Sequence, residues 1–222
     1  LAWSSAASDV YKRQGSIVKK IDDKSSFGFS FLRFGVDNIP NTTDLIDAQG
    51  NLNYDRITYF SAADMAFIGS YGKKISDYLS IGGSVKIINR TAGDFAQAWG
   101  FGLDLSTTYQ KNNWGFAIVA RDVTSTFNVW NYQLTDEMIN VFNTTGNELP
   151  QNGLELTLPR IILGINKKYQ LEENVSLLLE FNSNLTTDGQ RNTLISANPF
   201  SLDPHVGAEV NIKNIVYLRA GI

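Results

Sequence analysis

The sequence predicts an all-β fold, an antiparallel up-and-down transmembrane β-barrel of which this chain holds an incomplete set of about nine strands. Three observations predict it. Segments of alternating apolar and polar residues recur along the chain. They are joined in turn by tight hairpins and by long polar loops, so that one end of the sheet carries only short turns. Aromatic residues fall at the ends of these segments, where membrane barrels place their interfacial rings.

The expected strands are each close to the ~9–11 residues that cross a bilayer when tilted. In chain order they are residues 25–36, 57–71, 79–88, 99–109, 114–121, 156–168, 175–182, 205–212 and 215–222. Tight turns are expected near residues 72–78, 110–113, 170–174 and 213–214. Long loops are expected near residues 89–98, 125–153 and 184–201.

Each expected strand has one face of large apolar residues and one of small or polar residues. In residues 99–109, Trp99 and Phe101 alternate with Gly100 and Gly102. Alternation alone also fits a soluble β-sandwich, because both folds bury one face. Strand length, the glycine-rich polar face and the aromatic positions favour the membrane barrel. The residues expected to form the aromatic girdle are Tyr71, Tyr78, Trp99, Tyr109, Trp114 and Tyr169.

The composition excludes several classes of function. The 222 residues carry a net charge of -3, which argues against a nucleic-acid partner. No cysteine is present, so disulfide scaffolds, thiol catalysis and cysteine-ligated zinc are excluded. The one histidine, His205, has no recognisable catalytic context, and no metal-ligand spacing occurs. We therefore expect no enzyme activity, no cofactor and no metal.

Both ends of the chain are expected to be incomplete. Residues 1–14 resemble translated adapter sequence and are left out of the fold reasoning, as a non-native tail. Residues 15–222 are expected to form a partial outer-membrane β-barrel domain. The chain stops within an apparent strand, which indicates an internal fragment.

Charged residues recur near the middle of the expected inward faces. They are Asp64, Lys86, Asp104, Arg121, Arg160, Glu180, Glu209 and Arg219. Buried charges need partners, and facing residues on neighbouring strands lie close enough to pair. We expect the pairs Lys86–Asp104 and Asp104–Arg121. The set is interpreted either as a structural ion-pair network or as a constriction that selects solutes.

The longest expected loop, residues 125–153, is unusually apolar. Its candidate partner-docking residues are Phe127, Trp130, Tyr132, Met138 and Phe142. Thr135 is expected to cap a short helix. The loop is either a lid on its own barrel or a docking surface for a partner.

Pro159 interrupts an expected strand, because proline cannot donate to a ladder. It marks either the entry of that strand or a kink that opens the wall sideways.

Several stretches resemble the PorV/PorQ family of Bacteroidetes outer-membrane proteins, itself similar to the FadL-type channels. They are SFLRFGVDNIPNTTDLIDAQGN (residues 30–51), YFSAADMAFIGSYGKKISDYLSIGGSVKII (59–88), AWGFGLDLSTTYQKNNW (98–114), LPRIILGINKKY (158–169), DGQRNTLI (188–195) and LDPHVGAEV with VYLRAGI (202–222). Their order, more than any one piece, carries the resemblance. It implies a barrel of about fourteen strands, a lipid-facing exterior and no catalysis.

The function expected from this resemblance is a non-enzymatic role in type IX protein secretion, at the cell outer membrane. The implied partners are outer-membrane lipid, the type IX translocon and secreted cargo proteins. The alternative is a FadL-like passive channel for small hydrophobic molecules. That alternative requires an apolar path and a lateral opening, whereas the expected lumen is charged at mid-depth.

Overall fold

The computed structural model describes residues 10–42, 45 and 52–222. The strands are β1 (Val10–Lys20), β2 (Ser25–Asn41), β3 (Thr58–Lys74), β4 (Leu79–Ala92), β5 (Ala96–Lys111), β6 (Trp114–Arg121), β7 (Thr126–Tyr132), β8 (Gly153–Thr157), β9 (Arg160–Glu172), β10 (Val175–Thr186), β11 (Ile195–Ser196), β12 (Ser201–Ile212) and β13 (Val216–Gly221). The helices are the 3-10 helix η1 (Tyr54–Arg56) and α1 (Asp136–Thr145). Within the described ranges, no helix has the length and apolar character of a membrane span.

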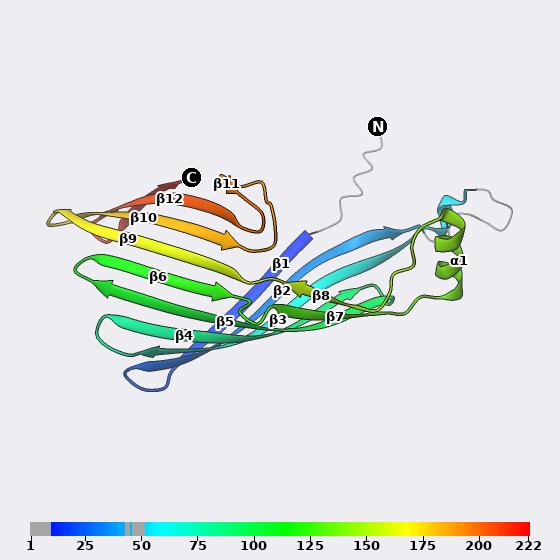
Figure 1. Ribbon diagram of the computed structural model, residues 1–222, viewed down its shortest axis with the longest axis horizontal. Helices are drawn as coiled ribbons and strands as arrows, with labels where there is room; N and C mark the ends of the chain where they lie inside the picture. Colours follow the sequence, from blue (N-terminus) through cyan, green and yellow to red (C-terminus); the bar gives the residue numbers. More distant parts are fainter. Residues whose placement is uncertain (1–9, 43–44, 46–51) are drawn as a thin grey trace.

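The strands form one antiparallel sheet, which confirms the predicted all-β class. Along its main path the order is β1-β2-β3-β4-β5-β6-β9-β10-β12-β11. Off this path, β13 pairs with β12, β7 pairs with residues 96–101 of β5, and β8 pairs with β7. The sheet curves into an open trough, with the tight turns at its left end and α1 at its right end (Figure 1). In the described part of the chain, β1 pairs only with β2 and β13 only with β12, so the barrel is not closed.

The turns show why the sequence reverses where it does. Asn112 and Asn113 both have positive φ, 51° and 64°, and join β5 to β6 in two residues. Two left-handed residues match the twist of a hairpin, and asparagine tolerates that conformation well. Lys213 and Asn214, both with φ of 55°, likewise reverse the chain between β12 and β13, in a connection of three residues, 213–215. The tight turns were thus predicted at the right places.

Several expected boundaries are wrong. The loop expected at residues 89–98 is a hairpin, because β4 and β5 pair as far as Ala92 and Ala96. The loop expected at residues 125–153 begins with β7 and ends with β8. The short strand β11 lies in the loop expected at residues 184–201. Residues 10–14, left out of the expected fold, pair with β2 as part of β1.

The molecule has almost no apolar core. In the described ranges, the buried hydrophobic residues are three alanines, Ala63, Ala96 and Ala98. Large apolar side chains instead cover the outward face, with Trp99 55% and Leu105 56% exposed. Soluble proteins bury such residues and rarely expose a continuous apolar surface. The outward face therefore needs a covering other than water.

Candidate functional site

The aromatic residues expected to form the girdle all have partly exposed rings on the outward face or in a turn. Tyr71, Tyr78, Tyr109, Trp114 and Tyr169 lie toward the tight-turn end, and Trp99 lies toward the long-loop end. Tyr78 and Tyr109 have ring centroids 6.4 Å apart.

Lys167 lies on the outward face of β9, opposite Trp114 and Leu179. Its Nζ sits 4.4 Å from the Trp114 ring centroid and 5.1 Å from that of Tyr169. A lysine that reaches along apolar surface to aromatic rings is typical of a membrane interface. The girdle itself stays a prediction.

The inward face of β4 and β5 carries a compact charge cluster. Lys86 Nζ lies 2.8 Å from Asp104 Oδ1 and 2.5 Å from Asp122 Oδ1. The Asp122 backbone N–H donates to Asp104 Oδ1 at 2.9 Å, and the Thr126 hydroxyl donates to Asp122. The three charged side chains are only 12–20% exposed. Nearly buried charges persist when they are paired in this way.

Gly102 lies beneath this cluster and leaves the room that it needs. A Cβ at Gly102 would collide with the Thr126 hydroxyl and lie 3.2 Å from Lys86 Cε. The glycines on this face, which the sequence showed only as small residues, thus let a lysine from β4 reach past β5.

The expected Lys86–Asp104 pair is present, but the expected Asp104–Arg121 pair is not. Asp104 instead binds Lys86 and the Asp122 N–H. Arg121 lies directly opposite Arg160 in the β6–β9 register. The pairing differs because residues 122–125 turn away from the ladder. This turn brings Asp122 to the place that Arg121 was expected to fill.

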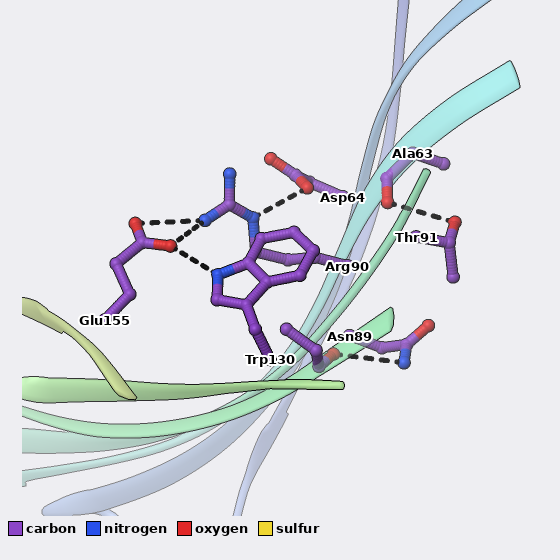
Figure 2. A network of polar contacts seen from close by, with 8 residues as sticks. Ala63, Asp64, Asn89, Arg90, Thr91, Trp130 and Glu155 are labelled. Carbon is purple, nitrogen blue, oxygen red and sulfur yellow. Dashed lines mark hydrogen bonds and ion pairs between the residues drawn. The ribbon is translucent and has the colours of Figure 1, made fainter. Parts of the chain in front are cut away.

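A second inward cluster centres on Arg90 of β4 (Figure 2). Arg90 Nε donates to Asp64 Oδ1 at 2.9 Å, and Nη1 donates to both carboxylate oxygens of Glu155, at 3.1 and 2.9 Å. The guanidinium lies 5.0 Å from the Trp130 ring centroid, and Trp130 Nε1 donates to Glu155 at 2.7 Å. A guanidinium can donate from several nitrogens to different carboxylates and stack on a ring at the same time. The cluster joins β3, β4, β7 and β8.

The remaining expected charges are more exposed. Arg219 Nε lies 2.5 Å from Glu209 Oε2, across the β12–β13 pair. Glu180 accepts a hydrogen bond from Asn182 Nδ2. No group of three or more His, Asp or Glu side chains in the described ranges is placed to hold a metal ion.

The long-loop end holds two adjoining cavities beside α1. The larger, of about 780 Å³, lies between the ends of β2 and β3, the β4–β5 hairpin and the start of α1. The smaller, of about 240 Å³, lies beneath α1 and is lined mainly by apolar side chains. Thr135 caps α1 as expected, because its hydroxyl accepts from the Met138 N–H at 3.3 Å.

The five candidate docking residues point in different directions. Met138 and Phe142 of α1 and Tyr132 of β7 line the smaller cavity. Trp130 faces inward in the Arg90 cluster and stacks on Tyr132, with centroids 5.9 Å apart. Phe127 lies outward, opposite Phe101. The docking role stays a prediction: three of these side chains line the smaller cavity, and the other two, Trp130 and Phe127, lie in the wall on opposite faces.

The wall is interrupted at one level. β6 ends at Arg121, and residues 122–125 are not part of a strand. The chain then continues as β7, which pairs with β5. On the next strand, β8 pairs with β7 and β9 pairs with β6, with Leu158 and Pro159 between them. The expected strand across Pro159 is therefore divided in two, and its ladder is incomplete, as a kink requires.

Sequence reasoning missed Asp122, Arg90 and Glu155. A signal for Arg90 was available, since it faces the expected charge Asp64 at an even spacing from Lys86. Asp122 had no such signal, because it lies where the regular strand pattern is broken. Glu155 alternates with Leu154 and Leu156 within β8, but this short strand was expected to be part of a loop.

Comparisons with known proteins find likeness in solved structures. No protein-family model matches the chain, and no curated protein matches its sequence. A solved structure described as that of a FadL homologue from Pseudomonas aeruginosa is similar over 94% of this chain, at 14% sequence identity and a TM-score of 0.45. The chain spans 58% of the length of that structure.

Proposed function

We propose that this chain forms part of the wall of an outer-membrane β-barrel, with its apolar face against lipid. Exposed Phe, Leu, Ile and Trp side chains cover the outward face, and Lys167 reaches the aromatic rings at the tight-turn end. Charged residues of the inward face are paired within clusters. This is the distribution of a membrane barrel, with lipid outside and a polar interior.

We propose further that the barrel is non-enzymatic and passes small hydrophobic molecules. The observation that carries this proposal is the cavity beneath α1, where Phe60, Phe95, Met138 and Phe142 surround apolar space at the mouth. Ligand sites are concave and mostly apolar, with a few polar groups. The interruption of the wall at residues 122–125 and 158–159 supplies a place where such a molecule would leave sideways into lipid.

The secretion role expected from the PorV/PorQ resemblance remains a separate proposal. It requires an apolar surface that is free for cargo or translocon components. Tyr132, Met138 and Phe142 face the cavity, and Trp130 belongs to the Arg90 cluster. The observed directions of these side chains therefore favour the channel.

These 222 residues contain no cysteine, so a thiol introduced here is the one labelled site of the full-length barrel once any cysteine elsewhere in that barrel is replaced by serine. Ser61→Cys places one thiol in the lining of the larger cavity, and Glu148→Cys places one on the exposed loop outside either lining. Cells that carry each variant would be treated with a bulky, membrane-impermeant thiol reagent. Uptake of N-phenylnaphthylamine would then be followed by its fluorescence.

We expect the reagent to slow uptake through the Ser61→Cys barrel and to leave the Glu148→Cys barrel unaffected. Equal uptake by both labelled variants, with labelling shown by mass, would refute entry through this cavity. Migration of unboiled and boiled samples on gels would show that each variant is a folded barrel. A protein found in the soluble fraction, without a shift on heating, would refute the membrane barrel itself.

A further inference from the structure

The two mouth cavities form one site with two compartments. They adjoin, because Asn41, Phe60, Phe95, Leu134 and Met138 belong to both linings. The smaller compartment is apolar. The larger adds hydroxyl, amide and carboxylate groups, among them Ser61, Asp94 and Gln133. A site that is apolar at one end and polar at the other fits an amphiphile, with its chain beneath α1 and its head group in the larger compartment.

The polar compartment has a definite sign of charge. Among the described residues that line either cavity, Asp94 is the charged one, and none is Lys, Arg or His. Asp94 is exposed and sits in the β4–β5 hairpin beside Phe95. An anionic head group would meet an unneutralised carboxylate here, whereas a cationic one would gain a partner.

The surrounding sequence strengthens this sign. Of the described residues that join the strands at the mouth, those in the ranges 52–57, 93–95 and 133–152 carry one basic residue, Arg56. Their acidic residues are Asp55, Asp94, Asp136, Glu137 and Glu148. At the tight-turn end of the sheet, lysines predominate over acidic residues. The net negative charge of the chain alone therefore does not explain why the mouth is acidic. Such a field concentrates cations and repels anions before they reach the site.

The lining also offers aromatic rings beside the carboxylate. Phe60 and Phe95, which line both cavities, meet edge to face with centroids 5.1 Å apart, while Tyr59 lines the larger cavity and Tyr132 the smaller. Ring faces attract ammonium groups, and aromatic pockets are a recurrent way of binding them. We propose that the mouth site binds cationic amphiphiles, in which an alkyl or aryl chain carries an ammonium group, in preference to anionic ones. This inference rests on the proposed channel function and assigns its substrate class.

Three probes with the same hydrocarbon tail separate charge from apolar affinity. They are decyltrimethylammonium, decanol and decanoate. Each would be titrated calorimetrically into the full-length barrel in nanodiscs of zwitterionic lipid, with empty nanodiscs subtracted. We expect decyltrimethylammonium to bind most tightly and decanoate most weakly, with about fivefold or more between the two.

Two variants locate the preference, and each has an internal control. Asp94→Asn keeps the shape of the side chain and removes its charge, and we expect a loss of about threefold to fivefold for the cation with decanol unchanged. Phe95→Leu keeps apolar volume and removes a ring, so it should weaken the cation and spare decanol. Asp55→Asn, an acidic position outside either lining, removes the same charge from the mouth, so it should lower the cation's affinity less than Asp94→Asn does and leave decanol unchanged.

The outcomes separate this inference from the function on which it rests. Decanoate binding as tightly as the cation would overturn the cationic preference and leave the channel for hydrophobic molecules standing. Binding of none of the three probes would overturn both. Unchanged cation affinity in Asp94→Asn, with the barrel folded by its gel shift, would also overturn the inference, even if Phe95→Leu failed to fold.

Discussion

Lys86 offers the most direct test of how the inward face is held together. Replacing it by methionine keeps a long apolar stem but removes the charge that binds Asp104 at 2.8 Å and Asp122 at 2.5 Å. Two carboxylates, 20% and 12% exposed, would then be left without their cation. Removal of one partner from a buried ion pair costs roughly 3–5 kcal/mol. The partial exposure places the expected loss at the low end, about 3 kcal/mol.

The assay is reversible urea unfolding of the full-length barrel in lipid vesicles, read by gel mobility and tryptophan fluorescence. Lys20→Met is the matched control, because Lys20 and Asp23 form an exposed pair at 2.6 Å, with side chains 65% and 96% exposed. That control should change stability by at most about 0.5 kcal/mol. The triple variant with Asp104→Asn and Asp122→Asn should recover much of the loss, because it leaves no unpaired charge. A Lys86→Met barrel as stable as the control variant would refute the reasoning.

Two further predictions concern the wall and a turn. In Arg90→Lys one ammonium group cannot bind Asp64 and Glu155 and also stack on Trp130 as the guanidinium does, so β8 should lose about 2 kcal/mol of local stability, measured as faster amide exchange in β8 than in β4. In the β1–β2 turn, the Ser25 hydroxyl at 2.6 Å and two backbone N–H groups lower the pKa of Asp22. A lowered pKa stabilises the fold above the unfolded value of about 3.9, and this stabilisation is lost as pH falls through the folded value. Ser25→Ala should therefore be less stable than the wild type near neutral pH and should match it in acid, as urea midpoints across pH would show.

Each of these predictions has a clear contrary result. Uniform exchange in the Arg90→Lys barrel would mean that the ladder to β7 alone holds β8. A stability difference between wild type and Ser25→Ala that persisted unchanged into acid would assign the effect to packing of the hydroxyl and not to the carboxylate.

The sequence predicted the strands and turns well where the controlling forces are local. Alternation along residues 99–109 and the paired asparagines at 112 and 113 depend on neighbours in the chain. The Thr135 cap was predictable for the same reason, since it needs only a helix that begins at the next residue. The Lys86–Asp104 pair followed once β4 and β5 were recognised as adjacent strands.

The missed features depend on contacts between distant parts of the chain. Arg90 and Glu155 meet only because β7 pairs with residues 96–101 of β5 and β8 pairs with β7. Neither β7 nor β8 was recognised as a strand in the apolar loop. Asp122 enters the charge cluster because residues 122–125 turn back toward β5. No spacing rule along one strand anticipates such a return, since its geometry is fixed by the glycines and the lysine of other strands.

The interruption at residues 122–125 also explains how one chain keeps its two faces distinct across the break. Arg121 continues the inward series of β6, and Phe127 lies outward opposite Phe101. The two are an even number of residues apart, so an unbroken strand would have put both on the same face. The inserted residues correct this phase, while the bonds from Asp122 to Asp104 and from the Val123 N–H to Leu103 O at 2.9 Å fix the insert to β5. The insert therefore returns the apolar side chains to the outward face and is held in place by its own hydrogen bonds. In both respects it resembles a β-bulge, which is a designed feature of a sheet and not a defect.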